Sequence, residues 1–560
     1  LAPLLPLFFY TTHKISIFYG LKLAISFVLL PSQEDNLHKK MKRKTDFLVI
    51  GSGVAGLSFA LKAAECGRVT IVTKGEIREC NTNYAQGGIC CVTYPPDTFE
   101  KHIEDTLVCG AGKCDVDAVR MVVEGAPDGI RDLIEWGTHF DKTAEGRYSL
   151  HREGGHTEHR ILHHRDLTGA EIERALISAV KRHRNIDILE HHFAVDVLTQ
   201  HHLGQEVNRH MDNIECYGAY VMDEKRDRIM TILAKFTVVC TGGVGNLYYT
   251  TTNPSVATGD GIAMVHRAKG IIENMQYIQF HPTTLYNPTE RPAFLITEAM
   301  RGYGAILKLQ NGKEFMHKYH PMGSLAPRDV VARSMDHEMK ITGAEYLYLD
   351  VRHKPAEQTI REFPNIYQKC LTLGIDITKD MIPVTPGAHY CCGGVKVDLN
   401  GESSIHRLYA LGESACTGLH GANRLASNSL IEAVVYAKAA AKHATGRLSE
   451  VDFEENIPDW NDDGMVVTEE MILITQNYKE MQQIMSYYVG IVRSNLRLER
   501  ALRRMEIIYR ETEELYQKSR LNVNLCELRN LIEVGYLIIK QAAALKESVG
   551  LHYTIDYPPR

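Results

Sequence analysis

The sequence has no surplus of basic residues and no Cys-x-x-Cys pair, and each absence argues against a class of function. Its 560 residues contain 63 Lys and Arg against 69 Asp and Glu, a formal net charge of −6. Bulk charge therefore gives no sign of a nucleic-acid partner. The thirteen cysteines are scattered except for the adjacent pairs Cys90–Cys91 and Cys391–Cys392, a poor layout for zinc or iron–sulfur ligation. The pattern is typical of a reduced, cytoplasmic protein that uses thiols as small apolar side chains.

The sequence also lacks internal repeats, low-complexity linkers and long apolar runs, except near its N-terminus. There, residues 15–30 are mostly apolar, but Lys22 interrupts them and no A-x-A cleavage site follows. We therefore predict that translation starts at Met41 and that residues 1–44 are an extension outside the fold.

A glycine-rich turn follows the first strand-like segment. Residues 47–50 are an apolar run that ends at Gly51, residues 57–64 are expected to be helical, and residues 69–73 are a second strand. The turn contains Gly51, Gly53 and Gly56 in G-x-G-x-x-G spacing. Glycines here let the backbone approach a pyrophosphate, while the helix N-terminus offers free N–H groups. This context predicts dinucleotide binding.

The residues directly after the second strand favour FAD over a nicotinamide cofactor. An acidic residue that holds the ribose is usual there, but Thr73 and Lys74 occupy the position. Three further segments, at 236–248, 258–268 and 408–415, each place a glycine turn beside a strand or helix end. A long, bent cofactor needs several such turns, and Glu413 is expected to accept from ribityl hydroxyls.

Several polar residues interrupt apolar segments in the middle of the chain. Taken singly, each is explained by a satisfied core histidine or a surface ion pair. Together they suggest a site for a dicarboxylate, because Arg offers a planar fork and His and Thr add donors. The residues are Gln279, His281, Thr297, Glu298, Arg301, Arg328 and His389.

The segments "NTNYAQGGI", "FHPT", "LAPRD", "HYCCGG" and "HGANRLASNSL" resemble the flavoprotein family of succinate dehydrogenase, fumarate reductase and L-aspartate oxidase. The resemblance runs from about residue 46 to 558. It is greatest to the aspartate oxidase branch. The respiratory members attach FAD covalently to a His five residues before the Gln of "AQGG", where this chain has Asn81. The segment "HREGGHTEHRILH" resembles the aspartate oxidase loop whose Glu, here Glu153, meets the substrate amino group.

The resemblance implies roles for individual residues. His281, Thr297, His389 and Arg424 match the set that holds the substrate carboxylates, and Gln279 lies beside the substrate. Arg328 matches the proton donor and acceptor, with Glu298 and Arg301 as its relay. The FAD-binding positions are matched by Gly51, Ser52, Gly53, Val54, Ala55, Gly56, Lys74, Asn81, Thr82, Asn83, Tyr84, Ala85, Gln86, Gly87, Gly88, Ala194, Val195, Asp260, Glu413, Ser429 and Leu430.

The resemblance also implies a reaction. L-aspartate would lose a hydride from its α-carbon to non-covalently bound FAD and a proton from its amine, giving iminoaspartate, with oxygen or fumarate as electron acceptor. The family passes iminoaspartate to quinolinate synthase for NAD biosynthesis. No metal, nucleic acid or stable membrane complex is expected.

The expected fold is α/β: a Rossmann-like FAD-binding domain with an inserted α+β capping domain and a C-terminal helical bundle. The FAD-binding domain is predicted at 45–275 and 389–440, the capping domain at 276–388, and the helical domain at 441–560, where the sequence is charged and helically periodic. Two alternatives remain: a fumarate reductase or succinate dehydrogenase flavoprotein subunit, and a flavin-binding protein without turnover.

Overall fold

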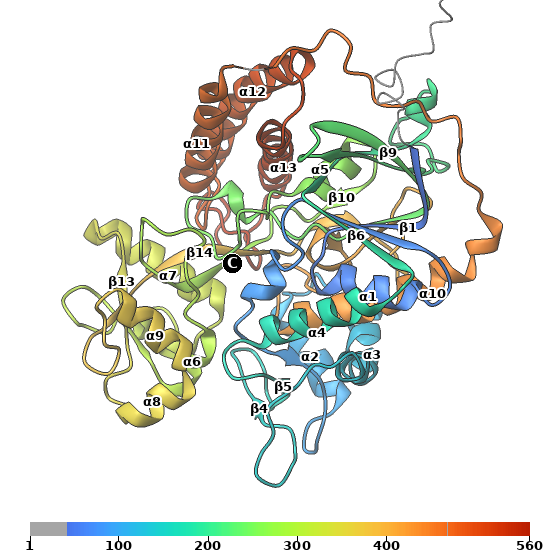
Figure 1. The fold of residues 1–560 in the computed structure, drawn as a ribbon. Helices are drawn as coiled ribbons and strands as arrows, with labels where there is room; N and C mark the ends of the chain where they lie inside the picture. Colours follow the sequence, from blue (N-terminus) through green and yellow to red (C-terminus); the bar gives the residue numbers. More distant parts are fainter. Residues whose placement is uncertain (1–41, 468, 560) are drawn as a thin grey trace, which may run out of the picture. The chain divides into compact units, whose positions relative to one another are not determined.

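The computed structural model describes residues 42–467 and 469–559 (Figure 1). A seven-stranded sheet forms the centre of this part of the chain. Its strands run in the order β6, β2, β1, β9, β8, β7. β8 pairs with the first half of β9, and β16 pairs with its last residues. β6, β2, β1, β9 and β16 are parallel to one another, whereas β8 pairs antiparallel with both of its neighbours, β9 and β7. The bounds are β1 Lys42–Ile50, β2 Val69–Thr73, β6 Ile186–Glu190, β7 His192–Leu198, β8 Gly218–Asp223, β9 Arg228–Val239 and β16 Leu408–Ala410.

The apolar run in β1 is buried on both faces of the sheet. Phe47 and Val49 belong to one hydrophobic core, and Leu48 and Ile50 belong to another. A strand in the interior of a parallel sheet is apolar at every position for this reason. The first core contains α1 (Val54–Ala63), α3 (Val116–Glu135), α4 (Thr168–Arg182) and α10 (Asn428–Gly446), and the second contains α5 (Asp260–Arg267) and the C-terminal helices.

One boundary differs from the prediction. Residues 42–44, predicted to lie in an extension outside the fold, are the first residues of β1. β9 is long enough to continue the ladder, so Lys42 pairs with Thr231 and Lys44 with Leu233. An apolar run does not reveal this end of the strand, because its first residues are charged. The rest of the predicted extension, including Met41, lies outside the described residues.

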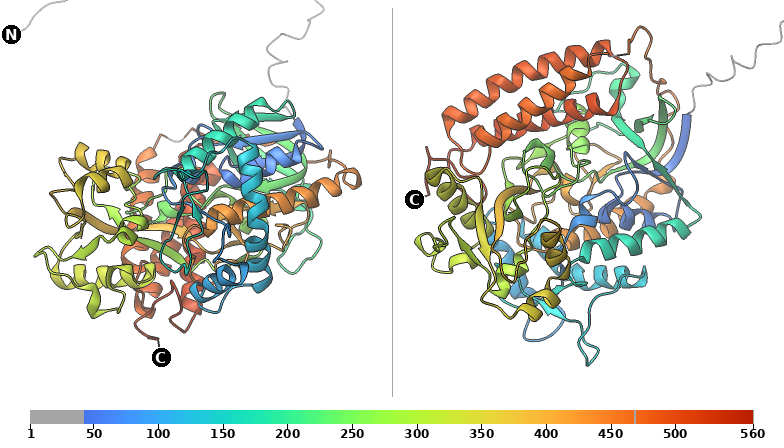
Figure 2. Two further views of the ribbon diagram at one scale, coloured as in Figure 1. Left: turned by 90° about the horizontal axis from the view of Figure 1, so that it is seen from below. Right: turned by 60° about the vertical axis from the view of Figure 1, so that its left-hand side comes forward.

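A second, antiparallel sheet has its own core and a set of short helices (Figure 2). Its order is β11, β14, β13, β12. We call this sheet with α6 to α9 the inserted unit. The predicted limit at 388 lies within β14, whose last residues pack into the second core of the main sheet. The bounds are β11 Ile278–Leu285, α6 Glu298–Tyr303, β12 Ile306–Lys308, α7 Arg328–Thr342, β13 Leu347–Asp350, α8 Ala356–Glu362, α9 Pro364–Thr372 and β14 Ile382–Cys391.

The C-terminal region is helical, as its periodicity predicted. It consists of α11 (Met471–Tyr488), α12 (Asn495–Lys518) and α13 (Val523–Ala544), which pack on one another and, through α13, on α5. None of the helices within 42–467 and 469–559 combines the length and apolar character needed to cross a membrane.

Candidate functional site

A cleft with about 1310 Å³ of empty space, part of it open to solvent, lies at the carboxyl ends of the parallel strands. Ligands of open α/β sheets bind at this edge. Fifteen residues of the predicted FAD set line the cleft: Gly51, Ser52, Gly53, Val54, Ala55, Lys74, Asn81, Thr82, Tyr84, Ala85, Ala194, Asp260, Glu413, Ser429 and Leu430. Gly56, Asn83, Gln86, Gly87, Gly88 and Val195 are not among the lining residues.

The glycines of the first turn are required by space. Gly51 has φ of +114°, and a Cβ there would stand 2.1 Å from the Cys240 carbonyl oxygen. A Cβ on Gly56 would stand 2.4 Å from the Gly51 oxygen. Gly56 thus has a packing role behind the cleft, which explains why it does not line it. α1 begins at Val54 with Gly53 as its N-cap, so the N-cap itself brings no side chain toward a phosphate. The Val54 amide donates to the Thr82 hydroxyl at 3.0 Å.

Lys74 is the centre of a charged cluster at one end of the cleft. Its Nζ lies 2.7 Å from an Asp260 oxygen, 2.5 Å from the Thr258 hydroxyl and 2.5 Å from a Glu527 oxygen. α5 therefore supplies the carboxylate that is usual after the second strand. Glu527 comes from α13, 453 positions further along the chain, and no local pattern points to it.

Glu413 and Asn81 meet near the middle of the cleft. Asn81 Nδ2 donates to Glu413 Oε2 at 2.7 Å, and the Cys391 amide donates to Oε1 at 3.0 Å. Burial raises the pKa of Glu413 to about 7. Asn81 Oδ1 is buried with no hydrogen-bond partner in the described part of the chain. This unpartnered oxygen and the Glu413 carboxylate, with the glycine turn, fit a flavin dinucleotide with many N–H and O–H donors.

Beyond the flavin end, two arginines converge on one amide. Arg424 donates through Nε and Nη2 to Gln279 Oε1 at 3.2 and 3.0 Å, and Arg328 Nη1 donates to the same oxygen at 3.2 Å. Arg424 Nη1 also donates to Ser429 at 2.7 Å, and its guanidinium lies 4.4 Å from the Tyr390 ring centre. Tyr390 lies inside the quoted "HYCCGG" segment, but sequence reasoning missed it as a site residue.

Arg328 belongs to a buried cluster of ion pairs. Arg328 Nε pairs with Glu298, and Arg301 Nη2 lies 3.2 Å from the same carboxylate. Burial alone would raise the pKa of Glu298, but the two arginines outweigh it and lower the pKa. For Arg328, burial is likewise outweighed by the carboxylates, and its pKa is raised. Both groups are therefore charged in the resting site.

The predicted histidines lie beside this cluster as neutral rings. The His281 and His389 ring centres are 5.3 Å apart. Burial, then the nearby arginines, holds both pKa values well below the usual range. His281 Nδ1 accepts from the Thr283 amide at 3.3 Å, so Nε2 carries the proton, and this buried N–H has no partner in the described structure. It is a free donor for a carboxylate. Thr297 is the N-cap of α6.

Glu153 is buried at the edge of the same region, with 7% of its surface exposed. Its Oε2 accepts from the Ser427 hydroxyl at 2.8 Å. Burial raises its pKa, while Arg328 opposes that shift. A cationic group on a ligand would therefore stabilise the ionised form of this carboxylate. No group of three His, Cys, Asp or Glu side chains suited to a metal occurs within 42–467 and 469–559.

Comparison with known families covers most of the chain. Residues 46–430 match the family model described as "FAD binding domain", and residues 478–560 match "Fumarate reductase flavoprotein C-term". L-aspartate oxidase from Yersinia pestis is 46% identical over 92% of this chain and 96% of its own length. The chloroplastic L-aspartate oxidase of Oryza sativa subsp. japonica is also 46% identical, over 92% of this chain and 82% of its own.

Solved structures agree on the fold. A mutant of E. coli quinol fumarate reductase superposes with a TM-score of 0.82 at 27% identity, covering 93% of each chain. An adenylylsulfate reductase from Archaeoglobus fulgidus, at 18% identity, has a TM-score of 0.70 over 93% of this chain and 92% of its own, a likeness of fold alone.

Proposed function

The chain belongs to the L-aspartate oxidase family of FAD-dependent flavoproteins, and we propose on that basis that it oxidises L-aspartate to iminoaspartate. FAD, when bound, accepts the two electrons as a hydride and passes them to oxygen or fumarate. The observation that carries the assignment beyond family membership is a buried carboxylate, Glu153, beside a site built for carboxylates.

The substrate carboxylates are held by Arg424, His389, His281 and Thr297. Arg424 is a planar donor already oriented by Gln279 and Ser429, so little freedom is lost on binding. The neutral histidines contribute N–H donors without adding charge. Gln279, between the two arginines, lies beside the bound substrate.

Arg328 acts on the proton that leaves or enters the substrate. A guanidinium is normally always protonated, and here its carboxylate partners raise its pKa further. Proton transfer therefore requires a coupled partner, and Glu298, in contact with Arg328 and Arg301, is placed for that role.

Glu153 distinguishes an amino acid from a plain dicarboxylate. Next to two substrate carboxylates, a glutamate repels succinate but pairs with the ammonium of aspartate. Glu153→Gln should therefore raise KM for L-aspartate strongly, by about tenfold or more for a lost charge-assisted contact. Fumarate reduction by the same variant should be kept or improved, because the repulsion of a plain dicarboxylate is removed as well. Equal losses in both reactions would remove the reason for this assignment.

The activity itself is tested by hydrogen peroxide release from the isolated FAD-loaded chain. L-aspartate should support it, whereas D-aspartate and succinate should not. Succinate oxidation without aspartate oxidation would favour a respiratory flavoprotein subunit, the second candidate that the fumarate reductase likeness supports. Bound flavin that L-aspartate fails to reduce anaerobically would indicate a protein without turnover.

Iminoaspartate is unstable, so we propose that it is handed to quinolinate synthase as the first step of de novo NAD biosynthesis. We propose a cytoplasmic location, which the scattered cysteines and the bacterial relatives support, whereas the Oryza sativa relative is chloroplastic.

A further inference from the structure

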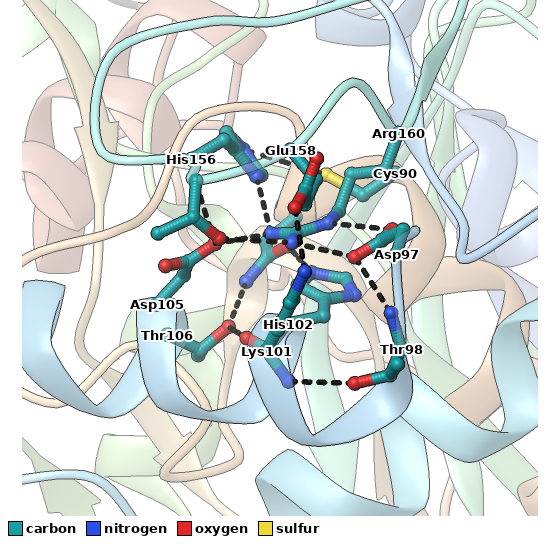
Figure 3. A network of polar contacts seen from close by, with 12 residues as sticks. Cys90, Asp97, Thr98, Lys101, His102, Asp105, Thr106, His156, Glu158 and Arg160 are labelled. Carbon is teal, nitrogen blue, oxygen red and sulfur yellow. Dashed lines mark hydrogen bonds and ion pairs between the residues drawn. The ribbon is translucent and has the colours of Figure 1, made fainter. Parts of the chain in front are cut away.

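A fully buried arginine, Arg160, belongs to a network of polar contacts that the proposed mechanism does not use (Figure 3). Arg160 has no exposed surface. Its Nε and Nη2 donate to the two Asp97 oxygens at 3.0 and 2.8 Å, and its Nη1 pairs with Asp105. Removing three charges from water has a large desolvation cost, so stability alone is a weak reason for such a cluster. The group that the cluster orients is therefore informative.

Arg160 orients the imidazole of His156. Arg160 Nη1 lies 3.1 Å from His156 Nδ1, and His156 Nε2 lies 2.9 Å from the Ala426 carbonyl oxygen. A guanidinium only donates and a carbonyl only accepts, so Nδ1 must accept and Nε2 must carry the proton. The ring is neutral, because burial and the neighbouring His102 lower the pKa of His156 to about 3. Arg160 thus selects one tautomer and one ring orientation.

His156 supports Glu153 from two directions, once through its backbone and once through its ring. On one side, the His156 amide donates to the Glu153 carbonyl at 3.2 Å, closing the turn that carries Glu153. On the other, His156 holds Ala426, the residue before Ser427, whose hydroxyl donates to Glu153 Oε2 at 2.8 Å. Ser427 has φ of +64°, a strained conformation for a residue with a side chain, and such residues persist only where the surroundings hold them.

Neighbouring residues of the network hold the first turn of α10. Ser427 is the residue before this helix, and Asn428, its first residue, accepts at Oδ1 from His102 Nε2 at 2.9 Å. Asn428 Nδ2 in turn donates to Thr106 at 3.1 Å. α2 (Phe99–Cys109), which carries His102, Asp105 and Thr106, therefore holds the helix start next to Ser429 and Leu430 of the cleft.

We propose that Arg160, with Asp97, Asp105 and His156, is a positioning network that holds the Glu153 carboxylate opposite the substrate amino group and thereby sets the preference for an amino dicarboxylate over a plain one. The proposal rests on the role given to Glu153 under the proposed function. No member of the network is among the residues that line the cleft. Its members act through the turn at Glu153 and through Ser427, so they are positioning residues.

His156 offers the sharpest test, because its two contacts can be removed or preserved. His156→Leu keeps an apolar side chain of similar bulk but loses both hydrogen bonds. His156→Gln retains an amide that accepts at one end and donates at the other. We expect His156→Leu to raise KM for L-aspartate by about tenfold, as expected for a misplaced charge-assisted contact. The flavin-detected Kd for succinate should stay within about twofold, and His156→Gln should recover most of the loss.

A matched control exists elsewhere in the chain. His552 is also buried and also accepts at Nδ1 from an arginine, Arg493, at 2.9 Å. That arginine donates onward to the Gln276 carbonyl, away from the Glu153 turn. His552→Leu should cost similar stability without changing the ratio of KM for L-aspartate to Kd for succinate. That ratio is a readout that a merely structural role would not move.

The outcomes distinguish failure of the network proposal from failure of the role proposed for Glu153. If His156→Leu shifts both ligands equally, or if His552→Leu shifts the ratio as much, the positioning role is wrong. If Glu153→Gln shifts the ratio and His156→Leu does not, only the network proposal fails. If Glu153→Gln leaves the ratio unchanged, the role of Glu153 itself fails. If His156→Leu does not fold with FAD, Asp97→Asn serves as a second variant, because it keeps the side-chain shape and weakens the contact with Arg160. We expect Asp97→Asn to shift the ratio in the same direction. An unchanged ratio would count against the proposal.

Discussion

At the scale of single residues, Gln279 accounts for the close approach of two guanidinium groups. Its Oε1 accepts from both Arg424 and Arg328, while its Nε2 donates to Asn423 at 2.9 Å and to the Arg424 carbonyl at 2.9 Å. Burial, and after it the charge of Arg328, lower the pKa of Arg424. In the proposed function, a substrate carboxylate bound beside Arg424 would offset both effects.

The two arginines should fail differently when replaced. Arg424 is expected to grip a carboxylate in ground state and transition state alike, with a charge-assisted bond of about 1.5–3 kcal/mol. Arg424→Leu should therefore raise KM strongly. Arg328→Leu should lower kcat by about 10²–10³, because its contact with the moving proton is made mainly in the transition state.

Succinate binding, followed by the flavin absorbance shift, separates ground-state affinity from turnover in both variants, and flavin content should stay full. If Arg328→Leu abolishes succinate binding while kcat at saturating L-aspartate is normal, the two roles are reversed.

Asn81 predicts how FAD is held. An amide cannot form the covalent flavin link that a His makes in the respiratory enzymes, and here Nδ2 is engaged by Glu413 at 2.7 Å. Acid precipitation should release all the yellow colour into the supernatant. Colour retained in the washed pellet would contradict the prediction.

At the scale of elements, the junction of β1 and α1 is the most constrained point of the cleft. Gly51→Ala would place a methyl group 2.1 Å from the Cys240 carbonyl, in a backbone conformation that already disfavours a side chain. The turn must shift, and with it the N–H groups that face the pyrophosphate. We expect this variant to be purified with little or no FAD, as measured by the ratio of flavin to protein absorbance.

Gly137→Ala is the control for backbone strain alone. Gly137 has φ of +105°, close to that of Gly51, but a Cβ there meets no atom within 4 Å in the described part of the chain. This variant should lose about 1–2 kcal/mol of stability and keep its full FAD content. Loss of FAD from both variants would mean that general destabilisation, not the turn, governs binding.

At the scale of the molecule, the inserted unit is tied to the Glu153 region by one buried aspartate. Asp166 Oδ2 accepts from the Asn365 amide at 3.2 Å, in the first turn of α9, and a second oxygen pairs with the Asn365 side chain. An unsatisfied helix N–H is thus capped by a residue 199 positions away. The contact joins the inserted unit to the segment just before α4.

Asp166→Ala should loosen that connection, since loss of a cap costs about 0.5–2 kcal/mol. We expect faster amide hydrogen exchange in α8 and α9, with little change in β1 or α1. Asp336→Ala is the control within the same unit, because Asp336 forms an ion pair with Lys340 of its own helix and so supports no connection between the two parts. Faster exchange throughout the chain would show that Asp166 supports general stability instead.

The sequence by itself determined the local elements and the chemistry they carry. β2 covers the predicted residues 69–73, and the glycine turn and the helical C-terminal region follow from spacing that each segment contains within itself. Several candidate site residues were found the same way, because Arg or His in an apolar, Gly- or Pro-punctuated segment is conspicuous in one dimension. Glu153 and Arg424 were identified instead by the resemblance to the family.

Only the tertiary structure decided which of these groups touch and what supports them. Glu527 reaches Lys74 from α13, Asp166 caps α9, and the His156 ring reaches the Ala426 carbonyl before α10, and none of these pairings has a local signal. The physical reason is that a hydrogen bond between residues more than a hundred positions apart depends on how two cores pack. Hydrophobic periodicity predicts that helices and strands exist, but the few ångströms that decide a contact are set by packing across the whole molecule.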